Sequence, residues 1–195
     1  MENILYLDDN INLYNKKIDK TIIMKPYKKT LKNGKIIDRE KFLKKFVKIK
    51  KNNYLNNYFI GECIIVIINS NYSKEDKYNL KEILEELNYK NVKFIKEKEL
   101  IKIDNKTVFI NYNFSYLNIY YIDSIGNIEM KMYEKDYIID KIIIKILNII
   151  NKRKIIITGK NYKELIPKLE KTNFEYFFYE NNDNLYIDLL NSKNV

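Results

Sequence analysis

The chain has 195 residues, 46% of them hydrophobic, with only four glycines and two prolines, a composition that excludes an intrinsically disordered polypeptide. It contains no histidine and one cysteine, Cys63, which excludes Ser–His–Asp triads, Cys–His dyads and an internal disulfide. The net charge of +10 rests on lysine, with arginine only at positions 39 and 153, and we expect the lysines to be spread along the chain as solvated faces.

The first half of the sequence predicts short strands and two helices. Asp8, Asp9 and Asn10 form a polar turn between two apolar runs, as in a hairpin. Ser73 and Asp76 match a capping box, and an apolar stripe at helical spacing follows them. We expect strands at 4–7, 11–14, 21–24, 58–68 and 92–95, a turn at Gly34, and helices at 38–51 and 73–87.

The second half repeats this order of elements. We expect antiparallel strands at 108–111, 117–122 and 128–132, a helix at 136–150, a buried strand at 154–157, a helix at 162–171, a strand at 174–179 and a terminal element at 185–190. The repeated order predicts two related α/β lobes.

The longest apolar stretch, 138–150, is interrupted by Asp140, Lys141 and Lys145 and is too short to cross a bilayer. The N-terminus lacks the positive region of a signal peptide. We therefore expect a cytoplasmic protein, with a peripheral position at the inner membrane face as the alternative.

Segment 69–77 resembles the strand exit and helix start of MreB, the bacterial actin homologue of rod-shape determination, where a Pro-Ser-Gly turn precedes a capped helix. Further segments follow in the family's order, at Lys25-Pro26 and at 34–38, 109–130, 136–146 and 155–169. The residues that fall in register after the turn, without a gap, are Leu80, Ile83, Leu84, Leu87, Val92, Phe94, Ile95 and Glu97.

The resemblance implies an α/β, actin-like (ribonuclease H-like) fold of two small related lobes, 1–105 and 106–195. Little sequence lies before Pro26 or between residues 150 and 154, where the family places its outer subdomains. We therefore expect the outer subdomains to be reduced or missing.

The resemblance also places the first phosphate hairpin of an ATP site at the N-terminus. Leu5, Leu7 and Asp8 stand where the family has Asp-x-Gly-Thr, so its Asp and Gly are absent. We interpret Asp8 and Asp9 as a solvated turn, with a displaced metal site as the alternative. Glu97 matches a position near the family's catalytic region, and a surface charge is its alternative interpretation.

The remaining nucleotide-site positions are degenerate. The second hairpin has Asn111, Asn113 and Ser115 where the family has Asp-x-Gly-Gly-Gly-Thr, and glycines let the backbone approach phosphate. In the adenosine loop only Gly159 survives, followed by Lys160, and Asp136 fits a helix N-cap better than a nucleotide contact. We predict no catalytic residue, no metal site and no cofactor, with ATP and Mg²⁺ as the alternative.

These observations favour a non-catalytic actin-like scaffold, a pseudo-ATPase of the cytoskeleton, cell shape or division. Its expected partner is another actin-like or cell-shape protein, or a second copy. The alternatives are a membrane-associated adaptor like FtsA or PilM, for which the lysines argue, and a divergent ATP-binding filament protein. Nucleic acid is disfavoured because arginine is scarce and most tyrosines fall at positions expected to be buried.

Overall fold

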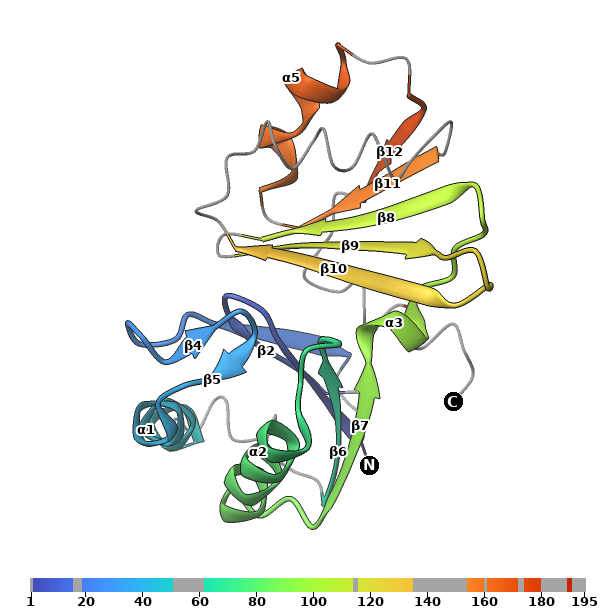
Figure 1. The fold of residues 1–195 in the computed structure, drawn as a ribbon. Helices are drawn as coiled ribbons and strands as arrows, with labels where there is room; N and C mark the ends of the chain where they lie inside the picture. Colours follow the sequence, from blue (N-terminus) through green and yellow to red (C-terminus); the bar gives the residue numbers. More distant parts are fainter. Residues whose placement is uncertain are drawn as a thin grey trace. The chain divides into compact units, whose positions relative to one another are not determined.

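The computed structural model describes residues 2–15, 19–50, 62–113, 116–134, 154–159, 161–171, 174–179 and 189–190. The chain divides into two compact units (Figure 1). Unit 1 comprises Met1–Leu100 with Tyr186–Val195, and unit 2 comprises Ile101–Leu185. The last ten residues, which the sequence analysis assigned to the second lobe, therefore group with unit 1. None of the helices in the described ranges is long and apolar enough to cross a membrane.

Unit 1 is built on a five-stranded sheet in the order β3-β2-β1-β6-β7. The strand β1 pairs antiparallel with β2 and parallel with β6, and β6 pairs parallel with β7. The predicted strands are confirmed where the structure describes them, and the described part of residues 1–100 adds a small hairpin and three helices. The elements are β1 Glu2–Leu7, β2 Ile11–Asn15, β3 Lys20–Met24, β4 Leu31–Lys32, β5 Lys35–Ile36, α1 Arg39–Lys50, β6 Cys63–Ile68, α2 Lys74–Glu86, β7 Asn91–Lys96 and α3 Glu97–Leu100.

The ends of α2 follow from local sequence. The Ser73 hydroxyl accepts the Asp76 N–H at 3.0 Å, and the Asp76 carboxylate accepts the Ser73 N–H at 2.8 Å. This reciprocal pair satisfies two N–H groups that a helix start leaves without partners, so the predicted capping box is confirmed. After the helix, Asn88 adopts φ 70°, a conformation that asparagine tolerates better than most residues.

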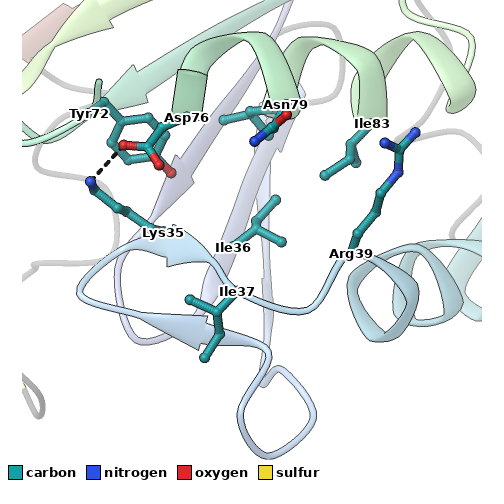
Figure 2. A pocket seen from close by; sticks show the side chains of 9 residues that line it. Lys35, Ile36, Ile37, Arg39, Tyr72, Asp76, Asn79 and Ile83 are labelled. Atoms are coloured by element: carbon teal, nitrogen blue, oxygen red, sulfur yellow. Dashed lines mark hydrogen bonds and ion pairs between the residues drawn. The ribbon is translucent and has the colours of Figure 1, made fainter. Parts of the chain in front are cut away.

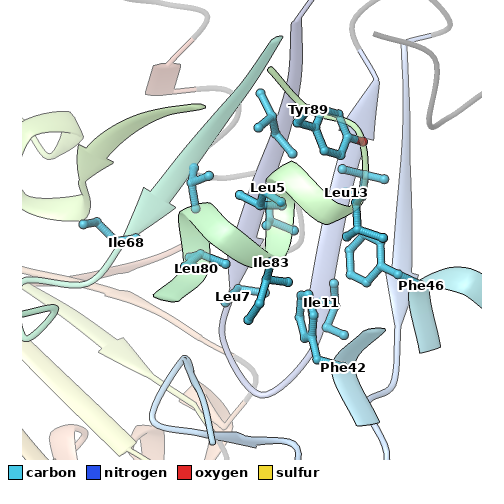
Figure 3. Close-up of a cluster of buried hydrophobic side chains, with 14 of the residues drawn as sticks. Leu5, Leu7, Ile11, Leu13, Phe42, Phe46, Ile68, Leu80, Ile83 and Tyr89 are labelled. Atoms are coloured by element: carbon cyan, nitrogen blue, oxygen red, sulfur yellow. The ribbon is translucent and has the colours of Figure 1, made fainter. Parts of the chain in front are cut away.

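One face of the unit 1 sheet carries the hydrophobic core (Figure 3). Leu5 and Leu7 of β1 are buried beneath α1 and α2. On α1, Phe42 and Phe46 are one helical turn apart, both fully buried, with ring centroids 4.8 Å apart. Burying a side chain of this kind stabilises the fold by roughly 1.5–3 kcal/mol.

Unit 2 repeats the topology of unit 1. Its sheet has the order β10-β9-β8-β11-β12, in which the first three strands of the unit are antiparallel and β11 pairs parallel with β8 and β12. The prediction of two related α/β halves is confirmed by this shared strand order. The strands are β8 Thr107–Tyr112, β9 Tyr116–Ile122, β10 Ile128–Glu134, β11 Lys154–Thr158 and β12 Tyr176–Phe178.

The helix predicted at 162–171 is wrong as a single element. The structure has a 3-10 helix, Tyr162–Glu164, followed by a separate α5, Ile166–Leu169. Pro167 has no N–H and cannot continue the hydrogen bonding of a helix that starts at 162, but it is tolerated in the first turn of α5. The helix predicted at 136–150 lies outside the described residues, and of the terminal element only 189–190 is described, as helix.

Candidate functional site

The carboxyl ends of the parallel strands in unit 1 bring three polar side chains to one edge of the sheet. Asp8 follows β1, Asn69 follows β6, and Glu97 follows β7. The strands lie in parallel register, so their ends meet at this edge. In open α/β sheets, this is the edge at which ligands bind.

Asp8 closes the turn between β1 and β2 on itself. Its carboxylate accepts the Asn10 N–H at 2.5 Å, and its own N–H donates to the Asn10 carbonyl at 3.1 Å. Asp8 is only 6% exposed, so the prediction of a solvated turn is wrong for this residue, because the carboxylate binds the backbone instead of water. Within the described ranges, no three acidic, histidine or cysteine side chains gather as a metal site.

The turn of the β4–β5 hairpin is seated against these strand ends. The Tyr72 hydroxyl donates to the Gly34 carbonyl at 2.6 Å, and the Asn69 amide donates to the Asn33 carbonyl at 2.7 Å. A Cβ atom on Gly34 would stand 2.7 Å from the Leu7 carbonyl oxygen, and Gly34 has φ +73°. The glycine is therefore required by both its backbone conformation and its close approach to β1.

Glu97 is fully buried, so its interpretation as a surface charge is wrong. It begins α3, and the buried Leu100 lies one helical turn later on the same element. Burial, and then the nearby carboxylates of Asp76 and Glu97, raise the pKa of Tyr72 above its ordinary value. In the sequence, the lysines around Glu97 suggested an exposed position. The spacing of one helical turn to the apolar Leu100 was the available signal of its burial.

In unit 2, amide side chains fill the second hairpin. Asn111 and Asn113 are each 2% exposed, and the Asn113 amide donates to the Asn111 side-chain oxygen at 3.2 Å. The Asn113 N–H donates to the Tyr116 carbonyl at 2.9 Å. Asn111 is flanked in register by Asn118 and Thr158, both buried. The structure thus brings Asn111 and Asn113 together, whereas Ser115, Asp136 and Lys160 lie outside the described residues.

Gly159 begins the loop after β11 and lies against β8. Its φ is +103°, and a Cβ atom there would stand 2.0 Å from the Tyr112 carbonyl oxygen. The same carbonyl accepts the Asn161 N–H at 3.0 Å, and the Tyr162 N–H donates to the Gly159 carbonyl at 3.3 Å. Close packing of this loop on β8 therefore accounts for the glycine without a ligand.

A separate groove lies between α2 and the segment that joins β5 to α1 (Figure 2). Its volume is about 310 Å³, and Leu80, Ile83 and Ile36 give it an apolar lining. Lys35 pairs with Asp76 at 2.6 Å, and Arg39 pairs with Glu82 and Glu86 of α2. The groove offers an apolar surface between ion pairs.

Comparisons with known proteins show which solved structures share this fold. No protein-family model and no curated protein sequence matches the chain. Among solved structures, MreB5 of Spiroplasma citri bound to AMPPNP aligns with TM-score 0.64 and 11% identity over 98% of this chain and 95% of that one. A Bacteroides thetaiotaomicron protein with an actin-like ATPase fold and unknown function aligns over the same shares with TM-score 0.63 and 11% identity. The ethanolamine utilization protein EutJ from Carboxydothermus hydrogenoformans aligns with TM-score 0.59 and 8% identity over 93% of this chain and 85% of that one.

The chain has the actin-like fold. The similarity covers nearly the whole chain and includes both units, which confirms the predicted fold class. At 195 residues the chain is short for this fold, consistent with reduced outer subdomains.

The aligned MreB5 structures hold AMPPNP or ADP, and the described residues of the corresponding turns in this chain do not fit a nucleotide phosphate. Phosphate cradles in such turns are made of backbone N–H groups that point at the ligand. In the first turn, the N–H groups of Asp8 and Asn10 already donate within the chain. Those of Asn113, Asn161 and Tyr162 do the same in unit 2. The first turn also buries the Asp8 carboxylate, a charge that repels phosphate.

Proposed function

We propose that this chain is a non-catalytic scaffold with an actin-like fold, a pseudo-ATPase that acts by binding other proteins. The observation that carries the proposal is the internal hydrogen bonding of the turns that would hold phosphate. Both Asp8 and Asn113 use their N–H groups within their own hairpins. A bound phosphate would have to break these hydrogen bonds before it could accept from the same N–H groups. The cost of breaking them disfavours the binding of a triphosphate.

The similarity to MreB5 supports a partner that is another actin-like protein or a protein of cell shape or division. Self-association would make a second copy of this chain the partner. The groove between α2 and the β5–α1 segment is suited to an apolar anchor on such a partner. Its rim residues Ile37 and Asn79 are exposed and accessible to a protein surface.

The proposal is tested by measuring phosphate release from Mg-ATP at micromolar protein, beside an active actin ATPase as positive control. We expect release no faster than a protein-free blank. Crosslinking in the source cell, followed by mass spectrometry, should recover a cytoskeletal or division protein, or the chain itself. An Asn79→Arg variant should weaken that crosslink, whereas Ser124→Arg, exposed in the β9–β10 turn, should not. Sustained turnover, or no cytoskeletal partner, would contradict the proposal.

The burial of Glu97 favours a second candidate, a divergent ATP-binding filament protein. A fully buried carboxyl at the carboxyl end of β7 is costly unless it is compensated, and such groups concentrate at functional sites. This candidate predicts that Glu97→Gln abolishes phosphate release that the unchanged chain supports. The scaffold proposal predicts no release from either protein.

A further inference from the structure

The strand β7 ends the unit 1 sheet, so one of its sides has no neighbouring strand among the described residues (Figure 1). On its other side it pairs in parallel with β6 along its whole length, from Cys63↔Asn91 to Ile68↔Lys96. A strand at the edge of a sheet presents a row of backbone N–H and C=O groups that no ladder uses. The outer side of β7 therefore offers a template on which a further strand can pair.

The sequence of β7 does not interrupt such pairing. Asn91 and Lys93 are exposed, whereas Val92 and Phe94 pack against the hydrophobic core of unit 1 and hold the strand in place. The register with β6 is continuous, and the strand contains no proline. Bulges and prolines are the usual means of ending a ladder at an edge strand, and β7 has neither.

The edge is basic. Residues 90–96 contain three lysines and no acidic residue. Lys90 pairs with Glu62 at 2.5 Å. No carboxylate among the described residues pairs with Lys93 or Lys96. The strand therefore carries two cationic side chains that lack a counter-charge in the described part of the chain.

These lysines select the charge of the strand that pairs here. Two copies of β7 placed edge to edge would bring lysine close to lysine, and like charges across a strand pair are destabilising. Glutamate or aspartate side chains on the added strand would instead form opposite-charge pairs with Lys93 and Lys96. The edge therefore favours an acidic strand over a second copy of itself.

A cavity of about 390 Å³ lies at the amino end of the same edge. Ile64 of β6 and Val92 of β7 give it an apolar lining, and Lys81 of α2 and Lys93 of β7 add positive charge. In strand-addition sites, pockets beside the edge receive alternate side chains of the added segment and give the site its sequence selectivity. This cavity is suited to one aliphatic side chain flanked by acidic residues.

We propose that the outer edge of β7 binds an extended, acidic segment of a partner protein, which adds to unit 1 as a further strand and places one aliphatic side chain in the cavity. Nucleic acid fits the edge less well, because a phosphate backbone does not repeat amide donors and acceptors at the spacing of a strand. The inference goes beyond the proposed function, which concerns the groove beside α2. It holds whether or not the chain binds a nucleotide.

The probe for the test is a fluorescently labelled peptide, Glu-Thr-Glu-Ile-Glu-Thr-Glu, titrated with the full chain at about 0.1 M salt and followed by fluorescence anisotropy. Three altered peptides separate the contributions. One has lysine in place of every glutamate, one has serine in place of isoleucine, and one has N-methyl groups on the isoleucine and the glutamate that follows it. N-methylation removes N–H donors without changing charge. Each altered peptide should bind about tenfold more weakly than the unmodified one.

Variants of the chain locate the site. Lys93→Glu/Lys96→Glu should weaken binding of the acidic peptide about tenfold, because opposite-charge pairs become like-charge pairs. The matched control, Lys44→Glu/Lys48→Glu, changes the net charge equally at two exposed lysines of α1 and should change binding less than about threefold. Circular dichroism verifies that both variants are folded. Binding should also slow hydrogen exchange at amides of residues 91–96, a readout that attraction between charges alone would not move.

The proposal is overturned if the unchanged chain shows no saturable binding of the acidic peptide up to millimolar concentration. It is also overturned if any of the three altered peptides binds as well as the unmodified one, or if the α1 control loses as much binding as the Lys93/Lys96 variant. Binding of single-stranded oligothymidylate that depends on Lys93 and Lys96, without binding of the peptide, would assign the edge to nucleic acid instead.

Discussion

The carbonyl oxygen of Tyr112 lies 2.0 Å from the position that a Cβ atom on Gly159 would occupy. The neighbouring atom is backbone, in the buried strand β8, so it cannot move aside as a flexible side chain would. The loop that follows β11 therefore packs on β8 through a contact that only glycine permits.

Gly159→Ala should lower the free energy of unfolding by about 3 kcal/mol or more, because overpacking against backbone adds to the strain of φ +103°. Urea denaturation measures the effect. Gly126→Ala is the matched control, since Gly126 has φ +93° and nothing within 4 Å of an added Cβ, so it should cost only about 1 kcal/mol. Equal losses in the two variants would show that the Tyr112 contact is unimportant.

Truncation of the two adjacent α1 residues Phe46 and Val47 should change the free energy of unfolding by very different amounts. Phe46→Ala removes a fully buried ring that packs on Phe42 and should cost about 3–5 kcal/mol. Val47→Ala alters an exposed side chain and should change the free energy of unfolding by less than about 0.5 kcal/mol. Chemical denaturation of both variants checks this, and similar losses would contradict the orientation of α1 on the sheet.

The capping box of α2 gives a smaller effect. Ser73→Ala leaves the Asp76 N–H without its hydroxyl acceptor and should cost about 1 kcal/mol. Thermal denaturation followed by circular dichroism measures it. Ser124→Ala, in the exposed β9–β10 turn, is the control and should be close to neutral. A neutral Ser73→Ala would mean that the cap is not formed in solution.

Tyr89 makes stability depend on alkaline pH. Burial raises the pKa of its hydroxyl to about 12, above the ordinary value near 10. The neutral phenol is favoured in the folded state, so this contribution is complete below pH 10 and is lost as the pH rises from 10 to 12, at about 1.4 kcal/mol per pH unit. Tyr89→Phe should remove that part of the slope. Denaturation curves at pH 8 to 12 test this, and an unchanged slope in the variant would be contrary to the assignment.

Local sequence predicted much of unit 1. Ser73 and Asp76 predicted the start of α2, and the spacing of Phe42 and Phe46 predicted the buried side of α1. The apolar run that ends at Ile68 predicted the central strand. These signals depend on neighbouring residues, which is why a single sequence contains them. The repeated order of elements predicted two related lobes, and the shared strand order of the two units confirms them.

The errors arose where distant residues decide the outcome. Glu97 is surrounded by lysines in the sequence, yet the fold buries it. The place of Gly159 against Tyr112 depends on the parallel pairing of β11 with β8, which no local pattern reveals. The expectation of evenly spread lysines is also wrong, because residues 25–50 contain eleven of the 36 basic residues and two of the 26 acidic ones. Counting along the sequence is sufficient to find this concentration of charge.

The most direct test of the scaffold proposal is a thermal-shift titration with Mg-ATP and Mg-ADP. A ligand at one hundred times its dissociation constant adds about 2.7 kcal/mol to the free energy of unfolding and raises the melting temperature by several degrees. We predict no shift with either nucleotide up to millimolar concentration, because the N–H groups of Asp8, Asn10 and Asn113 are already bonded within the chain. A clear, saturable rise with Mg-ATP would contradict this account and make an ATP-dependent filament protein the leading explanation.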